Sequence, residues 1–126
     1  MHPLIDRLTS ELGYPRFETL EACAAWASRP GLHVVFVPGD PKRNLESADV
    51  AVILPELHAA FQRRFDCAVA GDAMEEALRK ETVVFKTPSL IVFRDGRMVG
   101  GIPKVRDWDD YVARLSHLTS TPVAAE

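Results

Sequence analysis

The sequence predicts an α/β domain with a central mixed β-sheet and helices on both of its faces. Residues 32–37 are β-branched and almost all apolar, which is typical of a central strand that is covered on both sides. Residues 90–99 contain the turn Arg94-Asp95-Gly96-Arg97 between two apolar segments, a pattern that predicts an antiparallel hairpin with Gly96 free to adopt positive φ. Helical and strand-like segments alternate along the rest of the chain, and this order requires a sheet with helices on both faces.

The first third of the chain predicts two short helices and two strands. The N-terminal helix ends at Gly13, and its apolar positions are Leu4, Ile5, Leu8 and Leu12. A short strand is expected over 16–19, and an alanine-rich helix follows over 20–27, closed by Pro30-Gly31. The central strand over 32–37 then ends at Pro38-Gly39.

The rest of the chain predicts three helices, a strand and the hairpin. An exposed loop over 39–49 leads to a helix over 50–65, with Asp49 as its N-cap and Pro55 as the cause of a kink. A strand over 65–70 follows, and Asp72 with Glu75 resembles a capping-box variant before a helix over 73–80. Asp107 begins the last helix, whose buried stripe is expected to be Trp108, Tyr111, Val112, Leu115 and Leu118.

Length and charge limit the class of protein. The 126 residues are enough for one domain, which we expect over 1–118, with a flexible tail over 119–126. The 15 Lys and Arg residues against 18 Asp and Glu residues give a formal net charge of −3, so nucleic acid is not an expected partner. No apolar run approaches the roughly 18 residues of a membrane helix, and charges interrupt the N-terminal apolar pattern, so we expect a cytoplasmic protein without membrane insertion.

Common catalytic and cofactor motifs are not present in the sequence. Cys23 and Cys67 lie 44 positions apart, which matches neither a disulfide framework nor a zinc site and predicts two separate reduced thiols. The four histidines are dispersed, and none has metal-ligand spacing to a Cys, Asp or Glu. No Gly-x-Ser-x-Gly turn or glycine-rich phosphate loop occurs. We therefore expect no catalytic residue, no metal and no cofactor.

The order of elements and the Thr87-Pro88-Ser89 segment before the hairpin resemble thioredoxin. The resemblance implies a cis Thr87–Pro88 bond beside the loop that carries the thioredoxin dithiol. Residues 39–44 occupy that loop here and contain no sulfur, and Val35 stands where thioredoxins keep a buried carboxylate. Because dithiol exchange needs an attacking thiolate and a resolving thiol, the sequence lacks the thioredoxin redox apparatus.

The chain resembles the HyaE/HupG proteins more closely, over about residues 1–118. The resemblance depends on Asp40-Pro41-Lys42-Arg43, on Leu54-Pro55-Glu56-Leu57, on Thr87-Pro88 and on Asp107-Trp108. It implies a thioredoxin-like fold without the dithiol and a non-catalytic accessory protein or chaperone for [NiFe] hydrogenase maturation. The implied partner is the hydrogenase small-subunit precursor or its twin-arginine signal peptide.

Two segments are candidates for the partner-binding surface. The thioredoxin-like fold brings Asp40, Lys42 and Arg43 near Thr87, Pro88 and Ser89. Backbone groups beside the proline could pair with an extended peptide, and Asp40 could meet a partner arginine. Lys42 and Arg43 would repel a doubly basic motif unless their side chains point elsewhere.

Three alternatives remain open at this stage. The loop after the central strand could simply be solvated. The protein could be a thiol oxidoreductase that acts through a single cysteine, either Cys23 or Cys67. It could also be a structural subunit that associates through a sheet edge or a helix face.

Overall fold

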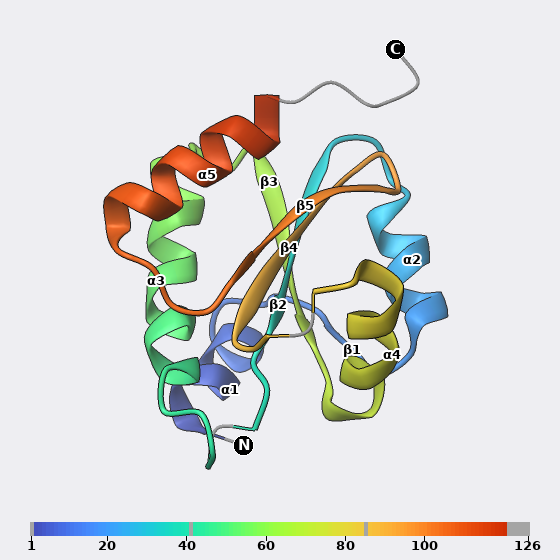
Figure 1. The fold of residues 1–126 in the computed structure, drawn as a ribbon. Coiled ribbons are helices and arrows are strands. Elements are labelled where there is room, and N and C mark those ends of the chain that lie inside the picture. Colours follow the sequence, from blue (N-terminus) through green and yellow to red (C-terminus); the bar gives the residue numbers. More distant parts are fainter. Residues whose placement is uncertain (1, 41, 85, 121–126) are drawn as a thin grey trace.

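Strand β2 lies in the middle of a five-stranded sheet of order β1-β3-β2-β4-β5 (Figure 1). The computed structural model describes residues 2–40, 42–84 and 86–120. In chain order the elements are α1 (Pro3–Ser10), β1 (Arg16–Phe17), α2 (Leu20–Ala27), β2 (Leu32–Val37), α3 (Ser47–Ala60), β3 (Phe65–Ala70), α4 (Asp72–Thr82), β4 (Ser89–Arg94), β5 (Arg97–Pro103) and α5 (Trp108–Ser120).

Strand direction decides which loops meet at the edge of the sheet. Strands β1 and β2 both run parallel to β3, whereas β4 runs antiparallel to β2 and β5 runs antiparallel to β4. The carboxyl ends of β1, β2 and β3 and the start of β4 therefore lie at one edge, where Val37 pairs with Ser89. The expected mixed sheet is confirmed, and the loop after β2 reaches the segment before β4.

Alternate residues of β2 enter two separate apolar cores, because successive side chains of a strand point to opposite faces. Val34 and Phe36 pack with α1, α3 and α5, whereas Val35 and Val37 pack with α2 and α4. Figure 1 shows the same division of the helices between the two faces. The expectation of helices on both faces is confirmed. Among the described residues, no helix is both long and apolar enough to span a membrane.

The β4–β5 hairpin has the predicted two-residue turn. Asp95 and Gly96 have φ of 51° and 88°, the left-handed conformation that two-residue turns require. The carboxylate of Asp95 accepts a hydrogen bond of 2.6 Å from the N–H of Gly31. The N–H of Asp95 donates to the Gly31 carbonyl at 3.0 Å, so the turn is fastened to the loop before β2.

Helix α3 differs from its expected bounds at both ends. It begins at Ser47, so Asp49 lies in its first turn and is not the N-cap. The hydroxyl of Ser47 donates to the Pro38 carbonyl at 2.5 Å, a long-range contact that the local pattern does not contain. The helix ends at Ala60 because Gln62 and Arg63 both have φ of 57°, which is incompatible with a continuing right-handed helix.

The last two helices also correct the sequence predictions. Helix α4 starts at Asp72 after Gly71, without a side-chain capping bond, so the expected capping box of Asp72 and Glu75 does not form. Trp108 is 42% exposed at the start of α5 and does not belong to the buried stripe. Helix α5 continues to Ser120, two residues into the segment expected as a tail. Residues 121–126 lie outside the described part of the chain.

Candidate functional site

The loop after β2 is held against the residue that precedes Pro88. Gly39 has φ of +76°, and a β-carbon built there would lie 2.8 Å from the β-carbon of Thr87, so a larger residue would need displacement of Thr87. The side-chain amide of Asn44 donates a hydrogen bond to the Thr87 carbonyl. The Thr87–Pro88 peptide bond is cis, which confirms the expectation from the thioredoxin resemblance. The two segments of the predicted surface are therefore in contact.

Asp40 organises the turn that follows. Its carboxylate accepts a hydrogen bond from the Lys42 N–H at 3.0 Å, and its carbonyl accepts from the N–H groups of Arg43 and Asn44 at 3.1 and 2.8 Å. The Arg43 guanidinium lies 3.8 Å from the same carboxylate, and both side chains are exposed, so this ion pair is weak. The Arg43 side chain thus turns back toward Asp40, which partly neutralises both charges.

The six residues expected on the surface are not equally accessible. Asp40, Lys42 and Arg43 are exposed and Thr87 is half-buried. Pro88 is buried, and Ser89 is only 1% exposed because it lies inside the sheet, paired with Val37 and Pro103. The expectation that Ser89 helps to line the partner-binding surface stays a prediction, and its buried side chain leaves almost no surface there for a partner to contact.

The carbonyl groups beside the cis bond are also occupied. The Thr87 carbonyl accepts from Asn44, and the Pro88 carbonyl accepts from the N–H of Lys104 at 2.7 Å. Each carbonyl oxygen has a second lone pair, so the expectation that backbone groups here pair with an extended peptide stays a prediction.

Glu75 of α4 is the residue of this region that the sequence reasoning missed. Its carboxylate accepts a hydrogen bond of 2.6 Å from the N–H of Gly39, and the residue is only 9% exposed. Burial raises its pKa and the carboxylate of Asp72 raises it further, whereas the Gly39 N–H bond and the positive charges of Arg79 and Arg16 lower it. One signal was present in the sequence, because Glu75 falls between Met74 and Leu78 on the apolar side of the helix.

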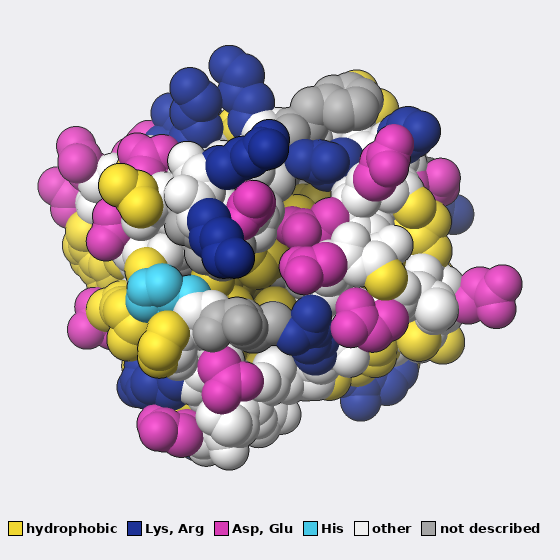
Figure 2. Space-filling model, turned by 90° about the horizontal axis from the view of Figure 1, so that it is seen from below, with side chains coloured by type: hydrophobic (Ala, Val, Ile, Leu, Met, Phe, Trp, Pro, Cys, Tyr) yellow, Lys and Arg dark blue, Asp and Glu magenta, His cyan; other side chains and the backbone are white. Residues whose placement is uncertain are grey.

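Asp72 and Glu18 add two further carboxylates around the start of α4. Asp72 acts electrostatically on Glu75, and the Glu18 carboxylate lies over Gly71, where an added β-carbon would collide with it. Glu18 also lies 3.4 Å from the Arg16 guanidinium. Figure 2 shows this edge of the sheet from below, with acidic side chains around a hollow and Lys and Arg side chains beside them. We call Glu18, Asp72 and Glu75 the carboxylate cluster.

The two cysteines lie on opposite faces of the sheet. Cys23 belongs to the core under α2 and α4, and Cys67 belongs to the core under α1, α3 and α5. Both are free and buried, which confirms the prediction of two separate reduced thiols. Burial raises the pKa of Cys23 to about 11 and the pKa of Cys67 to about 12, although a hydrogen bond with Tyr14 lowers the latter. Both thiols are therefore protonated at neutral pH.

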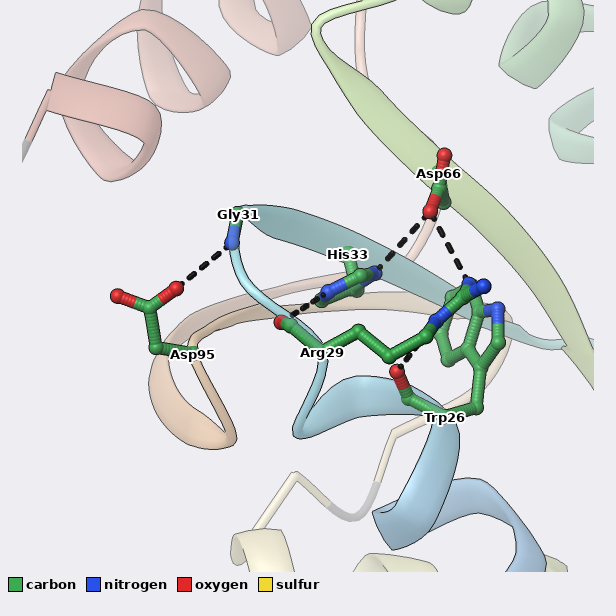
Figure 3. A network of polar contacts seen from close by, with 6 residues as sticks. All are labelled: Trp26, Arg29, Gly31, His33, Asp66 and Asp95. Atoms are coloured by element: carbon green, nitrogen blue, oxygen red, sulfur yellow. Dashed lines mark hydrogen bonds and ion pairs between the residues drawn. The ribbon is translucent and has the colours of Figure 1, made fainter.

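A second polar network lies at the opposite end of β2 (Figure 3). The Arg29 guanidinium lies 3.2 Å from the Asp66 carboxylate and 5.7 Å from the centre of the Trp26 ring. The buried His33 donates from Nε2 to the Arg29 carbonyl at 2.8 Å, and its Nδ1 lies 3.5 Å from Asp66. These contacts join α2 to β2 and β3, so the network holds elements together. Among the described residues, no group of three His, Cys, Asp or Glu side chains could hold a metal ion.

Comparisons with known proteins show that the sequence of this chain matches a protein family. The family model described as Hydrogenase-1 expression protein HyaE matches residues 4–111. Hydrogenase expression/formation protein HupG of Rhodobacter capsulatus is 58% identical over 117 residues, which cover 93% of this chain and 85% of that protein. Hydrogenase expression/formation protein HoxO of Azotobacter vinelandii is 39% identical over 115 residues, which cover 91% of this chain and 76% of that protein.

Solved structures support the same fold. The crystal structure of a hydrogenase expression/formation protein hupG from Rhodopseudomonas palustris CGA009 has a TM-score of 0.55 at 33% identity, covering 82% of this chain and 93% of that one. A thioredoxin mutant from Halobacterium salinarum NRC-1 has a TM-score of 0.67 at 17% identity, covering 86% of this chain and 92% of that one. At this low identity the second likeness shows the thioredoxin-like fold alone.

Proposed function

Because the chain belongs to the HyaE family of hydrogenase expression proteins, which gives it an accessory role in hydrogenase maturation, we propose that it binds the hydrogenase small-subunit precursor through its twin-arginine signal peptide. It performs no catalysis on this precursor. The binding takes place in the cytoplasm, before the precursor is exported.

The observation that carries the proposal is the construction of the loop after β2. In thioredoxins this place holds the dithiol, whereas here residues 39–44 contain no sulfur. Gly39 is in close contact with Thr87 and donates its N–H to Glu75, and Asn44 donates to the Thr87 carbonyl. The loop is therefore a fixed surface, which suits recognition and not electron transfer.

Charge at the same edge supports a cationic partner. The carboxylate cluster adjoins the loop through the bond between Glu75 and Gly39. Asp40 offsets part of the charge of Arg43 at 3.8 Å, whereas the exposed Lys42 and Arg43 side chains still oppose a basic peptide at the loop itself. Guanidinium groups form bidentate hydrogen bonds with carboxylates, which ammonium groups cannot do, so this cluster should prefer arginine to lysine.

The test is a calorimetric titration of the purified protein with a peptide that contains two adjacent arginines and with a control peptide that has lysines in their place. We expect at least about tenfold tighter binding of the arginine peptide, because bidentate contacts add roughly 1.4 kcal/mol or more. Asp72→Asn should weaken that binding. Glu76→Gln is the matched control, since Glu76 is exposed on the same helix and pairs with Lys80 at 3.3 Å. Equal binding of the two peptides, or no binding, contradicts the proposal.

The alternative of a single-cysteine oxidoreductase is disfavoured by the burial and raised pKa of both thiols. An insulin-reduction assay compares the wild-type chain with the Cys23→Ala and Cys67→Ala variants. Thiol-dependent activity in the wild type, lost in either variant, would replace the binding proposal with this alternative.

A further inference from the structure

Residues of α2 and α4 line an apolar groove. The two helices lie on the face of the sheet opposite α3 and α5 (Figure 1). The volume of the groove is about 290 Å³. The wall from α2 includes Cys23, Ala24 and Ala27, which recur at helical spacing, and the other side includes Leu78 and Phe93. Such an apolar, partly enclosed surface suits one or two apolar side chains of a partner.

The groove is lined by one acidic residue and lies further along α4 than Asp72 and Glu75. Glu81 lines it directly and forms no ion pair with any residue that the structure describes. Glu75, Leu78 and Glu81 are spaced three residues apart on α4, so each lies about 60° around the helix axis from the one before it. Successive members differ by an axial rise of about 4.5 Å, so Glu75 lies just under one turn before Leu78 of the apolar wall.

We infer that the groove between α2 and α4 binds the apolar segment of the same signal peptide whose arginine pair contacts the carboxylate cluster. This inference rests on the proposed function and adds a second contact surface to it. Secretory signal sequences place an apolar segment after a cationic one, and the molecule presents carboxylates and an apolar groove in that order along α4. The carboxylate cluster has the charge that complements an arginine pair, and the groove follows it along the same helix. A peptide with an arginine pair followed by an apolar segment therefore fits both surfaces.

The experiment uses two variants that differ by one helical position. Ala24 and Ala25 are both exposed on α2, but only Ala24 lines the groove. Ala24→Trp fills the groove with an indole, whereas Ala25→Trp places the same indole outside it. The probe is a synthetic peptide of two adjacent arginines followed by a leucine and alanine segment, and a second probe carries serines in place of that segment.

We expect Ala24→Trp to weaken binding of the apolar probe by about tenfold or more and Ala25→Trp to change it by less than about twofold. The serine probe should bind the wild type and Ala24→Trp equally. In NMR spectra, the chemical shifts of backbone amides in α2 and α4 should change when the apolar probe is added and should not change with the serine probe. If Ala24→Trp binds the apolar probe as the wild type does, the groove is not the site and the inference fails, although the proposed function stands. If the wild type binds neither probe, the proposed function itself fails.

Discussion

Gly39 offers the sharpest test of how the site is built, because two separate physical effects exclude a side chain there. At φ of +76° an L-residue has unfavourable backbone geometry, which costs about 1 kcal/mol for alanine. An added β-carbon would also lie 2.8 Å from the Thr87 β-carbon and closer still to the hydroxyl. Forced contacts of this kind in a packed region cost about 1–3 kcal/mol. We therefore expect Gly39→Ala to lower the free energy of unfolding by about 3 kcal/mol.

Gly13 supplies the matched control for the backbone effect. Its φ is +74°, and a β-carbon built there would meet no atom within 4 Å. Gly13→Ala should therefore lower the free energy of unfolding by about 1 kcal/mol only, since the steric contribution is missing. Urea unfolding followed by circular dichroism measures both values, with the midpoint and the slope fitted separately.

A double-mutant cycle with Thr87→Gly isolates the steric effect. In that background the atoms that collide with the new β-carbon are gone, so Gly39→Ala should cost only the backbone contribution of about 1 kcal/mol. The coupling free energy between the two positions should then be about 2 kcal/mol. A coupling below about 0.5 kcal/mol would refute the close packing of the loop against Thr87.

Three further predictions concern buried polar groups. The pKa of Glu75 is raised above 4.5, so ionisation of its carboxyl group opposes folding. The gain in unfolding free energy from Glu75→Gln should therefore be largest at neutral pH and shrink as the pH falls to 4.5. A gain that is independent of pH in urea titrations would contradict this. Tyr111→Phe removes the 3.1 Å bond to the Lys104 carbonyl and should lower the unfolding free energy by about 1 kcal/mol, and an unchanged urea midpoint would count against the bond. Cys67 should react with a disulfide reagent only as fast as the chain unfolds, and rapid labelling of Cys67 in the native protein would contradict its burial.

Local patterns were sufficient for most of the fold. Strands β2 and β3 and helix α2 have the bounds that were expected, because apolar periodicity, β-branching and the Pro-Gly stops act over a few residues. The hairpin turn was predictable for the same reason. The thioredoxin-like arrangement of these elements came from their order together with Thr87-Pro88, and the comparisons confirm it.

The predictions failed where distant segments compete with local preferences. Asp49 has a good side chain for an N-cap, but Ser47 bonds to the Pro38 carbonyl and the helix starts earlier. Trp108 has the spacing of a buried residue, yet it is 42% exposed at the first position of α5. A sequence pattern gives the spacing of side chains on one helix, but it does not say how far the neighbouring elements extend over that helix.

By itself, the sequence determined the order of helices and strands, the sulfur-free loop and the family to which the chain belongs. Only the tertiary structure decided which of the candidate site residues face solvent, since Ser89 is buried by strands on both sides whereas Asp40, Lys42 and Arg43 are exposed. It also showed the bond between Glu75 and Gly39, which are 36 positions apart in the chain. Burial and long-range hydrogen bonds depend on how separate segments pack, and no local pattern contains that information.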